Sequence, residues 1–162
     1  MNFEIDVSGE DLLNKDYTIC LASKDGSMIK GFKFKEELVN VLSSKYGQGL
    51  YKRYRKSAKG KALFKVRLYC IIVFNLLQSI PKNKISLTLC RDFSGWEKEI
   101  KETIISFLKK ISLQIVNEIY FDRLPNESNA HKYAYLMRQD TKDKMSTYIY
   151  LKLEEIEKWL IK

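Results

Sequence analysis

Short stretches in which apolar and polar residues alternate open the chain and predict three strands. Residues 3–7 alternate strictly and then meet Ser8-Gly9, a pattern typical of a strand that ends in a turn. The runs 17–21 and 28–34 are rich in β-forming residues and flank an Asp25-Gly26 turn, so we expect a hairpin. The first three strands are therefore predicted to be antiparallel.

The apolar spacing changes to a helical period after residue 35. Apolar positions between 38 and 42 follow an acidic pair at 36–37, which suits the positive end of a helix dipole. A longer apolar segment, 62–79, ends before Pro81 and predicts a second, more buried helix. Its most apolar part, 68–80, is shorter than the roughly 20 residues of a membrane span, so we expect no contact with a membrane.

The second half of the chain alternates between the two periods. Residues 85–90 predict a fourth strand, and 113–121 predict a fifth. Between them, the sequence Ser94-Gly95-Trp96-Glu97 has the spacing of a capping box, which predicts a helix start at that point. Apolar spacing over 130–137 and over 145–160 predicts two terminal helices.

This order of elements predicts an α/β domain with a five-stranded mixed sheet and helices on both faces. The length of 162 residues fits one domain, and only 2 prolines and 7 glycines leave little room for a long linker. Residues 1–162 are therefore predicted to form a single domain.

The balance of charge points to a polyanionic partner, with nucleic acid the first choice. The chain has 29 Lys+Arg against 20 Asp+Glu, a formal net charge of +9. Eight of the cations and no acid lie between 52 and 67, interleaved with Tyr51 and Tyr54. Lysine and arginine can neutralise successive phosphates while tyrosines stack on bases; the alternative is a solvated helix face. The predicted nucleic-acid-binding residues are Lys52, Arg53, Tyr54, Arg55, Lys56, Lys59 and Lys61.

Cysteine usage favours a reducing compartment. Cys20, Cys70 and Cys90 are odd in number, widely spaced and set among apolar neighbours, so they are interpreted as buried small hydrophobic residues. Their spacing fits neither a zinc site nor a disulfide framework. Residues 1–6 lack the pattern of a secretory signal. The expected location is the cytoplasm.

Two acidic residues stand near the ends of predicted strands, Asp6 in the first and Asp92 after the fourth. Together with these two acids, the order of the predicted strands and helices resembles the ribonuclease H-like fold over nearly the whole chain. That superfamily includes ribonuclease H, Holliday-junction resolvases and several exonucleases. The resemblance implies a metal-dependent nuclease that hydrolyses phosphodiester bonds of DNA or RNA with Mg²⁺ or Mn²⁺.

The same resemblance implies where the site residues lie. Asp6 and Asp92 match the acidic metal ligands of the first and fourth strands. His131, with Asp140 or Asp143 further along, matches the ligand at the final helical region. Glu37 is the candidate for the glutamate of the first helix, although it stands, after Glu36, at the beginning of that helix rather than in its middle. The implied catalytic set is Asp6, Asp92, Glu37, His131 and Asp140.

Each of these residues also has a structural interpretation. Asp6 can hydrogen-bond the turn that follows it, Asp92 can favour a helix N-terminus, and His131 can serve in packing. The chain would then be a non-catalytic nucleic-acid-binding or scaffold protein of the same fold. A protein-interaction module built on the aromatic C-terminal helix is a third hypothesis. The sequence leaves open DNA against RNA, and monomer against homodimer.

Overall fold

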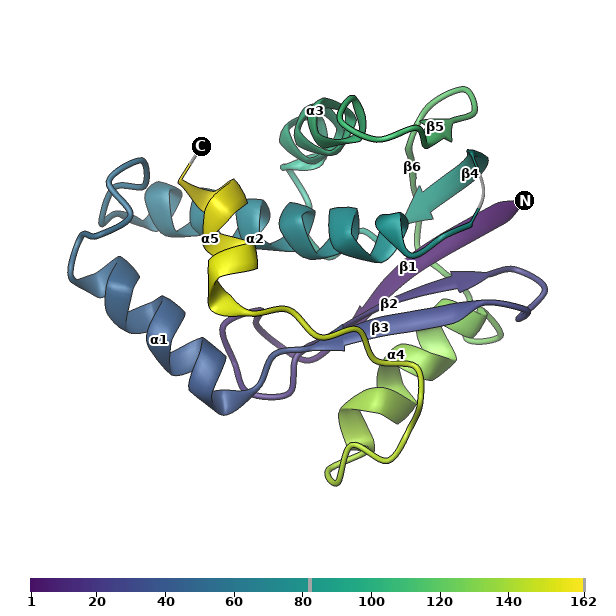
Figure 1. Ribbon diagram of the computed structural model, residues 1–162, viewed down its shortest axis with the longest axis horizontal. Coiled ribbons are helices and arrows are strands. Elements are labelled where there is room, and N and C mark those ends of the chain that lie inside the picture. The colour runs from purple at the N-terminus through teal and green to yellow at the C-terminus, as the bar shows by residue number, and fades with distance from the viewer. Residues whose placement is uncertain (82, 162) are drawn as a thin grey trace.

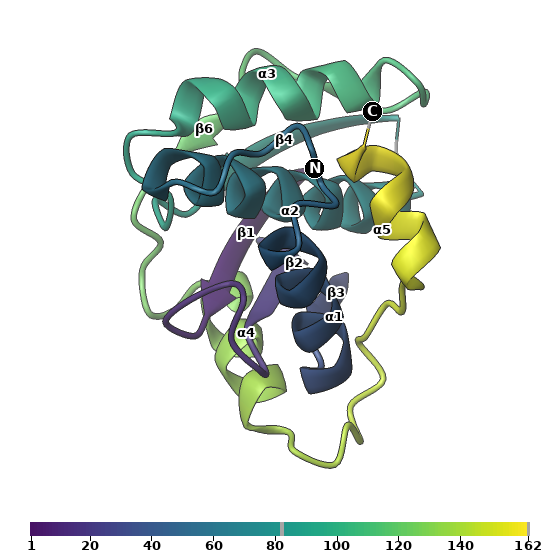
Figure 2. The ribbon, with the colours of Figure 1, turned by 90° about the vertical axis from the view of Figure 1, so that its left-hand side faces the viewer.

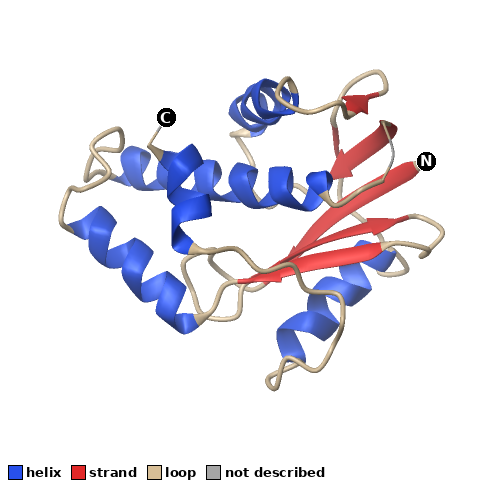
Figure 3. Cartoon of the chain, in the orientation of Figure 1, coloured by secondary structure: helices blue, strands red, loops and turns tan. Residues whose placement is uncertain are grey.

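The computed structural model describes residues 1–81 and 83–161, which form a mixed β-sheet with helices on both faces (Figures 1 and 3). The α/β class, the mixed sheet and the helices on both faces are thus confirmed. The elements in chain order are β1 Asn2–Ser8, β2 Thr18–Ser23, β3 Ile29–Lys33, α1 Glu36–Gly47, α2 Ala58–Gln78, β4 Lys84–Leu89, α3 Glu97–Leu108, β5 Gln114–Ile115, β6 Tyr120–Phe121, α4 Asn129–Gln139 and α5 Leu153–Leu160.

The sheet has the order β3-β2-β1-β4, with β5 and β6 both paired to β4. The first three strands are antiparallel, as predicted; Asp6 lies opposite Cys20, and Cys20 lies opposite Gly31. β4 runs parallel to β1, and β5 and β6 run parallel to β4. One edge of the sheet therefore collects the carboxyl ends of β1, β4 and β6.

The predicted fifth strand over 113–121 is wrong as a single strand, and the described sheet has six strands rather than five. β5 pairs with the beginning of β4 and β6 pairs with its end, so the two share one side of β4. Asn117 between them has a φ of 62°, in the left-handed region. That conformation interrupts an extended chain, which the hydrophobic pattern does not reveal.

The two faces of the sheet are covered by different helices. In Figures 1 and 2, α2 and α3 lie on one face and α4 lies on the other. Side chains alternate along β1, so that Phe3 and Ile5 join the large core beneath α2, whereas Glu4 and Asp6 contact the first turn of α4. The polar row of β1 thus faces a single helix.

The long helix α2 begins earlier than predicted because Ser57 caps it, accepting a hydrogen bond from the backbone N–H of Gly60 at 3.0 Å. Nearly all of its apolar run, 68–80, is buried in the core, which confirms the prediction of a buried helix. None of the helices in residues 1–81 and 83–161 is long and apolar enough to span a membrane.

The predicted capping box at residues 94–97 is wrong. Helix α3 begins at Glu97, and the Ser94 hydroxyl donates to the carbonyl of Arg91 at 3.3 Å instead of capping a helix. The Glu97 carboxylate accepts from the backbone N–H of Gly95 at 2.9 Å. Gly95 has a φ of 90°, which glycine adopts readily. The turn it makes moves the N-cap from Ser94 to Trp96, so the helix begins two residues later than the capping box predicts.

The predicted helix over 145–160 forms only as α5, Leu153–Leu160. The residues before it run extended along the outer side of β3. There the backbone N–H of Gly31 donates to the carbonyl of Thr147 at 2.9 Å, and the N–H of Ile149 donates to the carbonyl of Gly31 at 2.8 Å. Thr147, Tyr148 and Ile149 are β-forming residues, and the free backbone groups of β3 bind them in preference to a helix.

Candidate active site

A cleft of about 480 Å³ opens where β1 and β4 end. Because these strands are parallel, their carboxyl ends meet, and the backbone N–H of Cys90 donates to the carbonyl of Ile5 at 2.9 Å. Asp6 and Asp92 both line the cleft. Other polar residues that line it are Arg91, Arg123, Asn126 and His131. The structure therefore brings together three of the five predicted catalytic residues, Asp6, Asp92 and His131.

Asp6 is held by its neighbour in sequence and by α4. Its side chain is nearly buried; Oδ1 accepts from the backbone N–H of Val7 at 2.8 Å, and Oδ2 lies 2.8 Å from Nδ1 of His131. His131 stands on the first turn of α4, which Ser128 caps by accepting from the His131 N–H at 3.4 Å. Ser128 in turn donates to Glu4 at 3.0 Å. Two acids of β1 thus fix the helix that carries His131.

Asp92 is held by a tyrosine from a distant part of the chain. The hydroxyl of Tyr17 donates to Oδ2 of Asp92 at 2.6 Å. Burial raises the pKa of Asp92, as do the negative charges of Asp6 and Asp11, whereas the hydrogen bond from Tyr17 lowers it. Helix α3 begins five residues after Asp92, so this carboxylate does not lie in the first turn of α3.

The cleft offers two carboxylates to a hard divalent cation. Asp6 and Asp92 supply carboxylate oxygens, the ligands that Mg²⁺ and Mn²⁺ prefer. Within the described ranges, no group of three or more His, Cys, Asp or Glu side chains could hold a metal. An ion at this cleft would therefore depend on two carboxylates, with water and substrate phosphate as its remaining ligands, an arrangement common for Mg²⁺.

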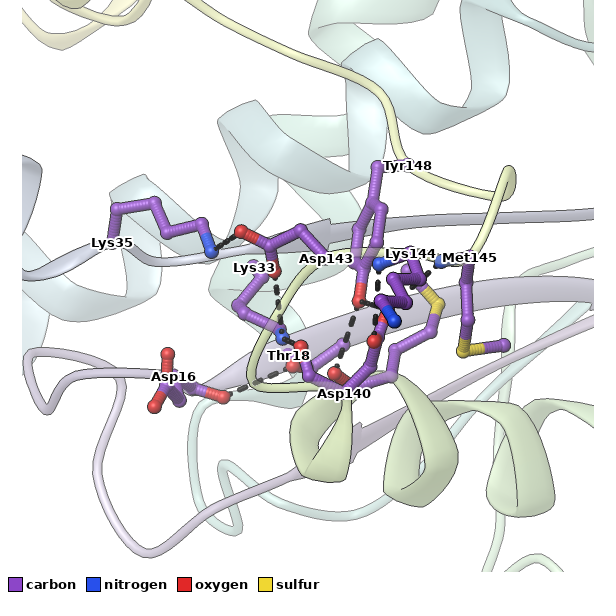
Figure 4. Close-up of polar contacts among 10 residues, drawn as sticks. Asp16, Thr18, Lys33, Lys35, Asp140, Asp143, Lys144, Met145 and Tyr148 are labelled. Atoms are coloured by element: carbon purple, nitrogen blue, oxygen red, sulfur yellow. Dashed lines mark hydrogen bonds and ion pairs between the residues drawn. The ribbon is translucent and has the colours of Figure 1, made fainter.

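Glu37 and Asp140, both predicted to be catalytic, do not lie in the cleft. Glu37 is exposed in the first turn of α1. Asp140 ends α4, nine residues beyond His131 and so about 13 Å away along a helix. Its carboxylate accepts from the backbone N–H of Met145 at 2.9 Å and from the hydroxyl of Tyr148 at 2.7 Å (Figure 4). Asp140 holds the extended C-terminal segment in place.

A second polar cluster surrounds Lys33, at the end of β3 (Figure 4). Lys33 is only 4% exposed, and its Nζ donates to the carbonyl of Asp140 at 2.7 Å and to Asp143 at 3.1 Å. Asp143 also pairs with Lys35. The other candidate third ligand, Asp143, is thus neutralised by two lysines, and the geometry indicates that this cluster anchors the C-terminal segment.

The tyrosines of the basic segment face inward, which contradicts the prediction that they stack on bases. Tyr51 is 3% exposed and Tyr54 is 8% exposed, and both rings pack on Phe64, with centroids 5.4 and 5.6 Å away. Their hydroxyls donate to Glu157 at 2.9 Å and to the carbonyl of Leu160 at 3.4 Å. Burial of the rings against α2 and α5 removes Tyr54 from the nucleic-acid-binding set.

The cations of the same segment divide into two groups. Lys65 pairs with Asp11 at 2.6 Å, and Arg67 donates to the carbonyl of Trp159 at 2.7 Å, so these two hold the fold together. Asp11 belongs to the 9–17 loop, which lies on the same side of the molecule as the basic segment (Figure 2). The cations that remain exposed are Lys52, Arg53, Arg55, Lys56, Lys59 and Lys61.

The prediction from sequence did not include four polar residues of the site, namely Tyr17, Arg91, Arg123 and Asn126. Tyr17 lies 75 positions from its partner Asp92, so no local pattern links them. Arg123 reaches the cleft because β6 ends beside β4, where the N–H of Asp122 donates to the carbonyl of Leu89 at 3.0 Å. Only Arg91 could have been suspected from the sequence, because it is the neighbour of Asp92.

Compared with protein-family models, with curated proteins and with solved structures, the chain shows no match.

Proposed function

We propose that this chain is a nuclease of ribonuclease H-like fold that depends on Mg²⁺ or Mn²⁺. The observation that carries the proposal is the meeting of Asp6 and Asp92 in one cleft, each held by a partner from another part of the chain. Two positive side chains, Arg91 and Arg123, line the same cleft. This combination of acids and cations suits a phosphodiester bound to a metal ion.

The arrangement of the sheet supports the proposed fold. Three antiparallel strands are followed by strands that run parallel to the first, in the order β3-β2-β1-β4, with β5 and β6 sharing the place beyond β4. That order follows the element order on which the resemblance rests. Asp6 on the central strand and Asp92 after its parallel neighbour stand where the resemblance implies metal ligands.

Each residue of the cleft has a specific task in this proposal. A divalent ion, when bound, activates water for attack on phosphorus and stabilises the oxygen that leaves. Asp6 and Asp92 hold the ion, and His131 keeps the Asp6 carboxylate in one orientation. Arg91 and Arg123 bind phosphate oxygens beside it. The exposed cations of 52–61 bind the phosphates further along the strand.

The experiment is cleavage of labelled DNA, RNA, hybrid and branched substrates with Mg²⁺ or Mn²⁺. We expect Asp6→Asn and Asp92→Asn each to lower the rate by at least about 100-fold while folding and nucleic-acid binding persist. The matched control is Asp25→Asn, an exposed aspartate in the β2–β3 turn whose carboxylate accepts hydrogen bonds from Ser23 and Ser27. An equal loss in Asp25→Asn would contradict the assignment.

A second candidate is a non-catalytic nucleic-acid-binding protein, and the limited donor set of the cleft favours it. Two carboxylates without a third make a weaker metal site than three do. This candidate predicts that no substrate is cut, with or without metal, while binding weakens steeply with salt. Replacing Lys52, Arg55 and Lys56 by glutamate tests the shared part of both candidates, since binding should then be lost in either case.

A further inference from the structure

The carboxylate of Asp92 stands on a loop with one partner to hold it. Residues 90–96 connect β4 to α3, and the hydroxyl of Tyr17 donates to Oδ2 of Asp92 at 2.6 Å. Within the part of the chain that the structure describes, no second hydrogen bond reaches this side chain. Asp6, by contrast, has a backbone partner and a histidine. The orientation of Asp92 therefore depends on Tyr17 alone.

Tyr17 is held by backbone hydrogen bonds and by the packing of its ring. It is 1% exposed, its N–H donates to the carbonyl of Asn14 at 3.3 Å, and its own carbonyl accepts from the N–H of Phe34 at 2.9 Å. Its ring meets Phe34 edge to face, with centroids 6.2 Å apart. Gly9 lies against the other side, where an added Cβ would stand 2.8 Å from Cδ2 of the tyrosine ring. The hydroxyl thus reaches the cleft from a rigid position.

We propose that Tyr17 is a positioning residue, which fixes the Asp92 carboxylate so that Oδ1 is the oxygen presented to a metal ion in the cleft. The inference rests on the proposed function, because it assigns Asp92 to the ion. The hydroxyl occupies Oδ2 and removes the rotation that would otherwise scatter the carboxylate among several orientations. A fixed ligand loses less entropy on binding than a mobile one, and partners of metal ligands commonly change metal affinity about 10- to 100-fold.

Tyr69 provides the matched comparison. It is a second tyrosine buried in the same region. Its ring is tilted against that of Phe93 with centroids 4.8 Å apart, and its hydroxyl has no hydrogen-bond partner among the described residues. Removing the hydroxyl of Tyr69 therefore deletes the same atom from the same residue type, also in the core, without removing a hydrogen bond from Asp92. Tyr17→Phe breaks the hydrogen bond to the carboxylate, and Tyr69→Phe does not.

The experiment measures Mn²⁺ binding to the protein alone by electron paramagnetic resonance, together with kcat and KM for cleavage. We expect Tyr17→Phe to weaken Mn²⁺ binding about 10-fold and to lower kcat with KM for the nucleic acid unchanged. Higher Mn²⁺ should restore part of the rate. Tyr69→Phe should match the wild type in both. In Asp92→Asn, adding Tyr17→Phe should cause no further loss, because the tyrosine acts through that carboxylate.

Gly9→Ala is the second variant, and it keeps the hydroxyl. Because Gly9 has a φ of 127° and an added Cβ would meet both the ring and Cα of Tyr17, the 9–17 loop and the ring must shift together. It should weaken Mn²⁺ binding in the same direction as Tyr17→Phe, so the test stands even if one of the two folds poorly. Wild-type Mn²⁺ affinity and kcat in a folded Tyr17→Phe would overturn the positioning role alone. A wild type that neither binds Mn²⁺ nor cleaves would overturn the proposed function as well.

Discussion

The two faces of the sheet bury different kinds of side chain. Beneath α2 the strands present large apolar residues such as Ile5, Ile19 and Leu21, which join one continuous core. Beneath α4 the same strands present the smaller residues Cys20 and Ala22, which cluster with Ala130, Ala134 and Met137 of that helix. The first face gains free energy through buried apolar area. The second face gains less from burial and has room for polar groups.

Polar groups on the α4 face are tolerated because they have partners. Glu4 accepts from Ser128, Asp6 binds His131, and Lys33 donates to the carbonyl of Asp140. A buried polar group without a partner would cost several kcal/mol, and one with a partner costs little. The comparison teaches that the α4 face, which borders the cleft, gains less free energy from apolar burial than the α2 face. In return, it holds polar side chains in fixed orientations.

The largest effect is expected from a truncation on the α2 face. Leu21 is completely buried in the large core, so Leu21→Ala should lower the free energy of unfolding by about 3 kcal/mol. Its neighbour Cys20 points to the α4 face, and Cys20→Ala should cost about 1 kcal/mol. Urea unfolding measures both. Equal losses would show that the two faces contribute alike.

The next effect tests the charge on the α4 face. Lys33→Met keeps most of the side-chain volume but removes the ammonium group from Asp140 and Asp143. We expect a loss of about 2 kcal/mol, less than for a fully buried pair because Asp143 still pairs with Lys35. The control is Lys35→Met, whose exposed pair should be worth under about 1 kcal/mol. A stabilised Lys33→Met would mean that this polar cluster opposes folding.

Alkaline pH should weaken the α4 face through Cys20. Burial raises the pKa of its thiol, and the negative charge of Asp6 raises it further. The unfolded thiol has a pKa of about 8.5, so this contribution to stability is complete below that pH and is lost as pH rises toward the folded pKa. Above pH 9 under reducing conditions, stability should fall less steeply in Cys20→Ala, by up to about 1.4 kcal/mol per pH unit. If the stability of the wild type and of Cys20→Ala fell equally with rising pH, the raised pKa of the Cys20 thiol would be contradicted.

The smallest effect concerns the fit of α4 on the sheet. Gly31 faces this helix, and an added Cβ would stand 2.3 Å from Cε of Met137 and 3.3 Å from the carbonyl oxygen of Ile19. The end of a methionine side chain can move, so Gly31→Ala should cost only about 1 kcal/mol. Combining it with Met137→Ala should remove the collision, and thermal unfolding of the two variants measures the coupling. A cost near that of Leu21→Ala would mean that α4 is packed as rigidly as α2.

The hydrophobic pattern predicted what depends on neighbours in sequence. Alternation along β1 identified both the strand and the acid at its end, and β-branched alternation before Asp92 identified β4. The pairing of Asp6 with Asp92 came from the resemblance to the ribonuclease H-like fold, not from the hydrophobic pattern. The choice of His131, in the first turn of α4, also came from that resemblance.

What the pattern missed depends on contacts between distant segments. An amphipathic residue such as Tyr54 can face a ligand or a core, and the docking of α5, about a hundred residues later, decides which. Asp140 and His131 are only nine residues apart in sequence, yet they lie at opposite ends of helix α4. The tie between Tyr17 and Asp92 has no local signal at all.

The extended segment beside β3 has a consequence for the behaviour of the protein in solution. β3 is the last strand on its side of the sheet, and an uncovered last strand offers its N–H and C=O groups to any other chain. The backbone groups of Thr147 and Ile149 hydrogen-bond the N–H and C=O groups of Gly31 in β3. The hydrogen bond between Lys33 and the carbonyl of Asp140 holds the segment in register. The residues before α5 thus protect β3 from edge-to-edge aggregation. A chain that lost them would expose β3 to pairing with the same strand of another copy of the protein.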